Sequence, residues 1–494
     1  MEGTVDHPEL YSKLDGTKRE IRLLRIDYDQ DTDGIHCRLG NFSLNDKPEY
    51  RALSYAWTKE VPTCLIYLNG VPFYVRRNLF LFLQVMHQKI WDDYIFIDAL
   101  CINQTDLREK TGQVRLMRDI YSNAGEVIAW VGSSLDLDHA REINANDLSL
   151  YFCNTKSGVD EMLADWRELG DYAAVEYFVQ AFCSKAYWSR LWIVQESLLA
   201  STLVIMYNNL RLPSDVLLYF GEKFLDMLEP ELMEQVRELG NDPNAIYTAG
   251  MVLGIGYTDN DSSLIRVLLA CKILAHRKHL AGNKDKMNMS AAIMMYSGHR
   301  CSVLHDKIFG LLGLTASNLV PDYSMEILRL YIHVLIECLL WNDDIPLKKQ
   351  EDTDALWNQT QNFHSALLRV LDLEPFHVTV AFITQYAFRT CSMEFGEDYF
   401  SAISLNWLLD HKPGDCLDFR EGNAVEKGMA WIRCRATRVR MREFVDDDSK
   451  RLPAYRGSRE RTYKQWITIV DEICASVLTN VDQFPQSNLF MLST

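Results

Sequence analysis

The stretch Tyr94–Val131, YIFIDALCINQTDLREKTGQVRLMRDIYSNAGEVIAWV, decides the fold. It opens with one apolar run, Tyr94–Asp98, and closes with another, Val127–Val131, and both have the composition of buried strands. Between them, Asp106 stands where a helix-capping residue accepts backbone hydrogen bonds, and apolar residues then recur with the 3.6-residue period of a helix. A strand, a helix and a strand in this order predict a βαβ unit with parallel strands.

Upstream of this unit the sequence predicts one more strand and a hairpin. Arg51–Trp57 is an apolar run that ends in aromatic residues, which is typical of a buried strand. The pair Asn69-Gly70 separates two β-rich runs, and this dipeptide is the strongest local signal of a tight hairpin turn. Asn78 then stands where it can cap the next helix.

Downstream, the region 136–180 is polar with a helical tendency and is interpreted as an insertion. Tyr187–Ala200 predicts one amphipathic helix, and Thr202–Tyr207 predicts a further strand of the same sheet. Beyond residue 345 the pattern is irregular, and the arginine-rich run at 433–442 has acidic neighbours that indicate a solvated face. The sequence therefore predicts an α/β protein: a mainly parallel sheet, inserted and appended helices, and a mixed C-terminal region.

The composition argues against several kinds of partner. A chain of 494 residues with 48% hydrophobic side chains can bury a large core and is too long for one ordinary domain. With 51 Lys and Arg against 68 Asp and Glu, the net charge is −17, which argues against a nucleic-acid partner. No stretch approaches the ~20 apolar residues of a membrane span, and the first residues lack the apolar core of a signal peptide. We expect no membrane span and a cytoplasmic location.

Motifs for common catalytic chemistry are missing from the sequence. The 12 cysteines are scattered without a CxxC pair, and the 12 histidines have no ligand spacing, so no metal site is expected. The sequence also lacks a phosphate-binding loop, a dinucleotide fingerprint, a GxSxG nucleophile elbow and the kinase motifs. These absences exclude the commonest enzyme classes.

Five ordered blocks of sequence resemble the fungal heterokaryon-incompatibility (HET) domain: RALSYAW, LNGVPFYVRRNL, FIDALCINQTD, EKTGQVRLMRDIYSNAGEVIAWVG and WSRLWIVQESLLA. A sixth stretch, HRCSVLHDKIFGLLGL with VPDYS, resembles the region that commonly follows that domain. The resemblance implies a self/non-self recognition protein that triggers programmed cell death, with an incompatibility partner protein or a second copy of itself as its partner. It implies an N-terminal extension at 1–19, a HET domain at 20–212, an associated helical region at 213–345 and a variable C-terminal region at 346–494.

HET domains in turn resemble TIR domains, which have a flavodoxin-like parallel sheet and in several branches cleave NAD. This resemblance implies a flavodoxin-like (TIR-like) topology, NAD as the substrate without a further cofactor, and Glu196 as the essential carboxylate. Such a carboxylate stabilises the positive charge that develops on the ribose when its bond to nicotinamide breaks. Tyr55, Trp57 and Asp98 at strand ends, and Trp192 one helical turn before Glu196, are the predicted substrate-binding residues.

Other roles for these residues remain open at this point. Glu196 could pair with Arg190 on a helix surface, and Trp57 and Trp192 could be core anchors. Asp98 could accept hydrogen bonds from the backbone of the loop that follows it. For the whole protein, the alternative to an NAD glycohydrolase is a non-enzymatic cell-death switch that acts by self-assembly or by recruiting a partner.

Overall fold

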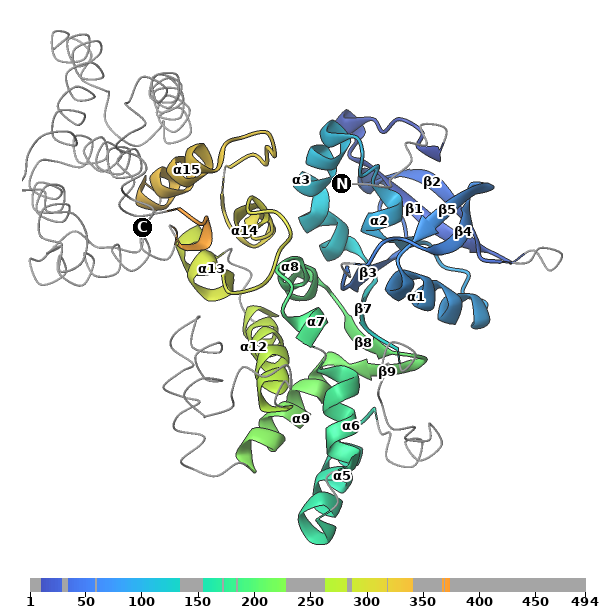
Figure 1. Cartoon of the computed structure of the whole chain (residues 1–494), viewed down its shortest axis with the longest axis vertical. Coiled ribbons are helices and arrows are strands. Elements are labelled where there is room, and N and C mark those ends of the chain that lie inside the picture. The colour runs from blue at the N-terminus through green and yellow to red at the C-terminus, as the bar shows by residue number, and fades with distance from the viewer. Residues whose placement is uncertain are drawn as a thin grey trace, which may run out of the picture. The chain divides into compact units, whose positions relative to one another are not determined.

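The computed structural model of the chain, drawn in Figure 1, describes most of the residues before 341. The described residues are 10–28, 34–57, 60–133, 154–170, 173–183, 185–227, 263–281, 287–317, 319–340, 367 and 369–373. The chain divides into two units, Met1–Tyr323 and Ser324–Thr494, and each is described by itself. The run at 433–442, and the predicted insertion up to residue 153, lie outside the described residues.

Unit 1 is built on one nine-stranded sheet, whose strand order is β5-β4-β2-β1-β6-β3-β7-β8-β9. The strands are β1 Glu20–Asp27, β2 His36–Ser43, β3 Arg51–Tyr55, β4 Cys64–Leu68, β5 Val71–Val75, β6 Ile95–Phe96, β7 Glu126–Gly132, β8 Leu203–Tyr207 and β9 Leu210–Pro213. The neighbours β6, β3, β7 and β8 are all parallel to one another. These are the four runs predicted to share a sheet, and the α/β prediction is therefore confirmed.

The remaining strands make the sheet mixed. Strand β1 pairs antiparallel with β2 and with β6, and β9 pairs antiparallel with β8. Strands β4 and β5 form the predicted hairpin, in which Asn69 and Gly70 have φ values of 52° and 81°. These left-handed conformations at both turn residues are what a two-residue turn of the favoured twist requires.

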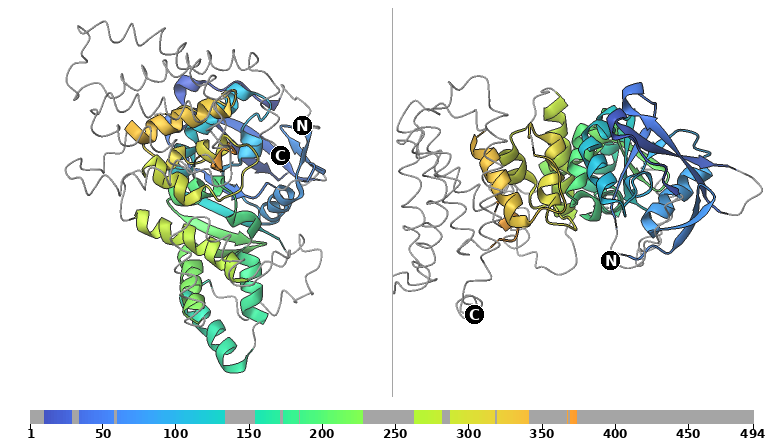
Figure 2. Two further views of the ribbon diagram at one scale, coloured as in Figure 1. Left: turned by 60° about the vertical axis from the view of Figure 1, so that its left-hand side comes forward. Right: turned by 90° about the horizontal axis from the view of Figure 1, so that it is seen from above.

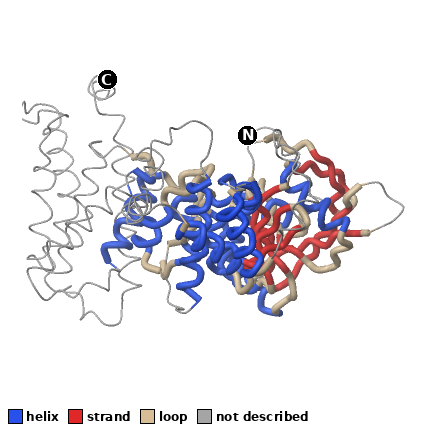
Figure 3. The backbone as a smooth tube through the Cα atoms, turned by 90° about the horizontal axis from the view of Figure 1, so that it is seen from below, coloured by secondary structure: helices blue, strands red, loops and turns tan. Residues whose placement is uncertain are grey.

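Helices cover both faces of the parallel strands, as Figures 1 and 3 show. Among the described residues of unit 1, the helices are α1 Arg77–Gln88, α2 Asp98–Cys101, α3 Leu107–Asn123, α5 Lys156–Leu169, α6 Ala173–Phe182, α7 Lys185–Trp188, α8 Trp192–Leu199, α9 Ser214–Asp226, α12 Ser263–Ala281, α13 Met289–Tyr296 and α14 Asp306–Phe309. In the right-hand view of Figure 2, the blue strands β1, β2, β4 and β5 and the yellow helix α13 lie at opposite sides of unit 1. In unit 2 the structure describes helix α15, Ile327–Leu340.

The two faces of the sheet receive different helices because side chains alternate along a strand. On one face, the indole of Trp130 on β7 packs against Phe82 and donates to Asn78 of α1. On the other face, Tyr121 of α3 packs against Phe96 of β6, and α8 also lies on this side. The parallel strands are thus buried on both faces, which explains their nearly continuous apolar sequences.

Three local predictions need correction. Asn78 lies inside α1, where its side chain donates to the Ala56 carbonyl, so it is not a cap. The run 94–98 forms only a two-residue strand, because Asp98 already begins α2. The predicted helix 187–200 is split into α7 and α8. By contrast, Asp106 caps α3 as predicted, since its carboxylate accepts from the backbone N–H groups of residues 108 and 109.

Candidate active site

Glu196 lies on α8 directly against the parallel strands. Its side chain is only 3% exposed, and its Oε2 accepts a hydrogen bond of 2.5 Å from Ser54 Oγ on β3. Residues Ile193 to Leu198 of α8 are all buried, so this helix is not amphipathic as predicted. A carboxylate in this position is removed from water and depends on the protein for its stabilisation.

Hydroxyl groups surround the carboxylate of Glu196. Because Ser54 gives its only proton to Glu196, the Tyr187 hydroxyl, 2.8 Å from Ser54 Oγ, donates to Ser54 in turn. The Tyr121 hydroxyl also lies beside Glu196. Burial and the negative charge of Glu196 both raise the pKa of Tyr187, which therefore stays protonated and able to donate. Tyr187 and Ser54 thus form a chain of donors that ends on Glu196 Oε2, while the Tyr121 hydroxyl donates to the Leu53 carbonyl at 3.1 Å.

The protonation of Glu196 is set by opposing effects. Burial raises the pKa of its carboxyl, and the negative charge of Asp98 raises it further. The Arg190 guanidinium and the hydroxyls of Ser54 and Tyr121 act in the opposite direction, and the resulting pKa is about 7. Near neutral pH the group therefore exists in both charge states, and such a shifted carboxyl in a structured site is a mark of functional residues.

Asp98 and Trp57 contact each other at the carboxyl ends of the strands. The indole Nε1 of Trp57 donates to Asp98 Oδ1 at 3.4 Å, and the same oxygen accepts from the Ala99 backbone at 2.7 Å. Burial raises the pKa of Asp98, while Arg190 lowers it. The guanidinium of Arg76 lies 5.2 Å from the centre of the Trp57 ring. Asp98 therefore does accept from the following backbone, and it also belongs to the electrostatic surroundings of Glu196.

Tyr55 is the last residue of β3, next to Ser54 in the chain. Its register partner is Trp130, so its side chain faces the α1 side of the sheet while Ser54 faces α8. Its ring centre lies 6.4 Å from that of Trp57. Burial and the charge of Asp98 raise the pKa of Tyr55. Tyr55 and Glu196 thus flank the same strand end from opposite faces.

Trp192, at the start of α8, makes its polar contact with the segment that follows α13. It hydrogen bonds to Asp306 of α14, whose carboxylate also accepts from the Tyr323 hydroxyl at 2.8 Å. The Asp306 side chain is buried, and burial raises its pKa. This contact ties the predicted site helix to the HRCSVLHDKIFGLLGL segment.

A cavity of about 990 Å³ lies at the opposite, amino ends of the strands. It is lined by residues that include Tyr50, Arg51, Glu126 and Thr202, and by none of the predicted site residues. Its charges pair with each other, since Arg51 contacts both Asp93 and Glu126. Positive and negative side chains balance there, whereas the carboxyl ends hold the buried carboxylate of Glu196 and the half-buried one of Asp98, both with raised pKa values.

Sequence reasoning missed Ser54, Tyr121 and Tyr187 as neighbours of Glu196. For Ser54 a signal existed, because a serine inside the apolar run Arg51–Trp57 must find a partner when the strand is buried. In the sequence the two tyrosines have the pattern of ordinary core aromatics, and only the fold brings them to Glu196. Within the described part of the chain, no cluster of His, Cys, Asp or Glu could hold a metal ion, and no helix is long and apolar enough to cross a membrane.

Comparisons with known proteins agree with the sequence blocks. Residues 50–196 match the model of the family "Heterokaryon incompatibility protein (HET)". A relative from Neurospora crassa, "Heterokaryon incompatibility protein 6, OR allele", is 27% identical over 215 residues, covering 33% of this chain and 29% of the relative. The chain thus matches less than a third of that relative's length. No solved structure matches the chain. The matched segment starts just before β3 and ends at Glu196, and residues 50–196 of this chain are therefore a HET domain.

Proposed function

We propose that this protein acts in heterokaryon incompatibility, where its HET domain triggers cell death by cleaving the bond between nicotinamide and ribose in NAD. The observation that carries the proposal is Glu196: a buried carboxyl with a pKa of about 7, held by Ser54 at the carboxyl end of a parallel sheet. Ligands of open α/β sheets bind at this edge. The name of the Neurospora crassa relative supports the biological role.

The topology supports a TIR-like assignment. Taken in chain order, the four parallel strands follow the sequence second, first, third, fourth across the sheet. This is the order of the first four strands in flavodoxin-like sheets. The antiparallel strands β1 and β9 are additions to that core.

The chemistry requires an ionised carboxylate. When the bond between ribose C1′ and the nicotinamide nitrogen breaks, nicotinamide leaves with the electron pair as a neutral molecule, and the ribose develops positive charge. Glu196 stabilises that charge, water then bonds to C1′, and a proton is released. Because only the ionised form works, the rate rises with pH through the pKa of Glu196. The reaction takes place in the cytoplasm, with an incompatibility partner or a second copy as the trigger.

The alternative is a non-enzymatic switch that kills by self-assembly or by recruiting a partner. The observation that favours it is the burial of Glu196, which leaves only 3% of the residue exposed. In that case Glu196 holds α8 on β3 through Ser54 and has no chemical role.

Measuring NAD with the purified full chain separates the two functions. Glu196→Gln is compared with Glu222→Gln, the same change at an exposed glutamate paired with Lys278. We expect nicotinamide release by the wild type and by Glu222→Gln, and a loss on the order of 10²–10³ in rate for Glu196→Gln with a melting temperature at least that of the wild type. Killing by Glu196→Gln in a fungal growth assay, with cellular NAD unchanged, would contradict the enzymatic function and leave the switch.

A further inference from the structure

The chain breaks its helical path between α7 and α8, at Ser189–Leu191. Here Arg190 forms a parallel β-bridge with Arg300. The Arg300 backbone N–H donates to the Ser189 carbonyl at 2.6 Å, and the Leu191 N–H donates to the Arg300 carbonyl at 2.9 Å. Arg300 lies outside the matched HET segment, so a downstream segment determines the backbone position of Arg190.

The side chain of Arg190 reaches the end of β3. Its Nη1 donates to the carbonyl of Tyr55, while the neighbouring Ser54 donates to Glu196. The guanidinium and the carboxylate are therefore attached to consecutive residues of one strand. They interact by charge, and the Arg190 guanidinium also acts on Asp98.

The other groups that face Glu196 come from each element packed around it. Asp98 on α2 is negative, and Ser54, Tyr121 and Tyr187 are neutral hydroxyl groups, while Tyr55 lies on the opposite face of β3. Helix α12 also packs on α8, but its cation Arg277 donates to the carbonyls of Ser197, Ala200 and Ser201 at the far end of that helix. Among the described groups that act on Glu196, Arg190 supplies the positive charge.

We propose that Arg190 is a positioning residue for Glu196: its backbone pairing with Arg300 places its guanidinium at the Tyr55 carbonyl, one residue from the Ser54 that binds Glu196, and there it supplies the positive charge for that carboxylate. The inference rests on the proposed function for its catalytic meaning. Without this charge, burial and Asp98 together neutralise Glu196, and a neutral carboxyl cannot stabilise a developing positive charge. The segment around Arg300 thereby becomes part of the site.

The test measures the titration of the Glu196 carboxyl itself. Full-length protein carrying ¹³C-labelled glutamate carboxyls is titrated by NMR, and Glu196→Gln identifies the signal. Arg190→Gln removes the charge, and Arg190→Lys retains it. Arg118→Gln is the control, because Arg118 also donates to a backbone carbonyl, that of Gly313, but is not among the groups acting on Glu196.

We expect Arg190→Gln to raise the pKa of Glu196 by about one to three pH units, the range for loss of a nearby opposite charge. Arg190→Lys restores most of the difference, and Arg118→Gln leaves the pKa where it is. An unchanged pKa in folded Arg190→Gln, or an equal rise in Arg118→Gln, would overturn the inference. If Arg190→Gln does not fold, Arg190→Lys decides: a pKa near that of the wild type supports charge as the cause, and a large rise contradicts it. The titration needs no substrate, so it stays readable if NAD is not cleaved.

Discussion

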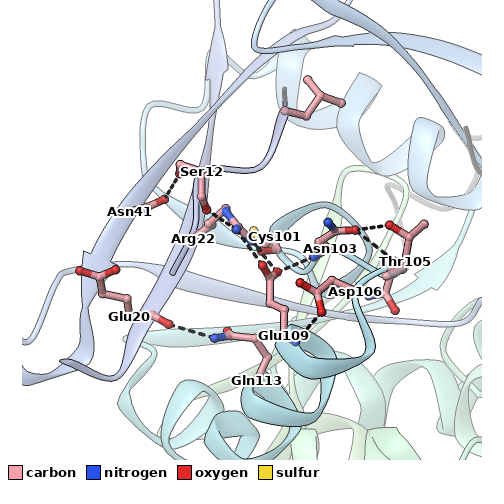
Figure 4. A network of polar contacts seen from close by, with 12 residues as sticks. Ser12, Glu20, Arg22, Asn41, Cys101, Asn103, Thr105, Asp106, Glu109 and Gln113 are labelled. Carbon is pink, nitrogen blue, oxygen red and sulfur yellow. Dashed lines mark hydrogen bonds and ion pairs between the residues drawn. The ribbon is translucent and has the colours of Figure 1, made fainter. Parts of the chain in front are cut away.

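Two glutamates of unit 1, Glu109 and Glu196, are held in opposite ways. Glu109 on α3 accepts two hydrogen bonds from Arg22, at 2.6 and 2.9 Å, and a third from the Asn103 backbone at 2.7 Å (Figure 4). Arg22 also donates to the carbonyls of Cys101 and Ser12. Glu196 instead has hydroxyl partners, a carboxylate among its neighbours, and a guanidinium that is bound to a carbonyl.

The difference separates a carboxylate whose charge the fold matches from one whose charge the fold opposes. At Glu109 the negative charge is matched by the bidentate guanidinium of Arg22. The same hydrogen bonds join the loop after Asp98 to β1 and to residue 12. At Glu196 burial and Asp98 work against ionisation, so the charged form reduces the stability of the fold. Under the proposed function, the chemistry needs this destabilising charge.

The largest effect is expected from breaking the Glu109 network. Arg22 is 1% exposed and the Glu109 side chain 12%. Arg22→Ala leaves a carboxylate without its cation in a buried place, so we expect the free energy of unfolding to fall by about 3–5 kcal/mol. Urea denaturation measures it.

Arg25→Ala is the matched control on the same strand, because Arg25 pairs with Asp92 at the surface. Surface pairs contribute little, so its effect should be much smaller. Equal losses of unfolding free energy in the two variants would mean that the Arg22 network stabilises the protein no more than a surface ion pair does.

A smaller effect is expected at Gly310, which packs against the start of α8. A Cβ there would lie 2.9 Å from the Asp306 carbonyl oxygen and 3.3 Å from Leu191 Cδ2. Gly310→Ala should therefore lower the free energy of unfolding by about 1–3 kcal/mol, the usual result of overpacking. Thermal unfolding with a denaturant series measures the change.

The same substitution at Gly112 is expected to change the free energy of unfolding in the opposite direction. Gly112 lies in α3, and a Cβ at this position has nothing within 4 Å. Alanine is the better helix former, so we expect a gain of about 0.5–1 kcal/mol. A stabilising Gly310→Ala would show that the segment after residue 300 is not packed tightly on α8.

Much of the sheet could be predicted because its signals are local. The strand runs, the Asn69-Gly70 turn and the Asp106 cap each depend on residues within a few positions of one another. The break at Ser189–Leu191 could not be predicted, because it depends on pairing with Arg300, more than a hundred residues away. Helical periodicity continues through the break, and the tertiary contact overrides it.

The site could be predicted only in outline. Glu196, Asp98 and Trp57 followed from the family resemblance and from their places at element ends. Ser54 and Arg190 could not be assigned their roles from sequence, since a serine in a strand and an arginine in a helix have many possible partners. Their role depends on the register of β3 and on where the Arg190 side chain ends.

The central claim, that Glu196 is kept at a cost in stability, makes a definite prediction about pH. A carboxyl group whose pKa is about 7 in the folded state, against its ordinary value of 4.5, binds its proton more tightly when folded. Its contribution to stability is therefore complete below pH 4.5 and is lost as the pH rises to about 7. Glutamine in its place stays neutral at every pH, so this loss of stability does not occur.

The most direct test is the free energy of unfolding of wild type, Glu196→Gln and the exposed control Glu222→Gln between pH 5 and pH 8. We predict that the free energy of unfolding of Glu196→Gln rises relative to that of the wild type as the pH rises, and exceeds it at pH 8 by about 1–3 kcal/mol. The free energy of unfolding of Glu222→Gln should have the same pH dependence as that of the wild type. A Glu196→Gln variant that is less stable than the wild type at pH 8, with the same pH dependence, would contradict the account and make Glu196 a structural residue like Glu109.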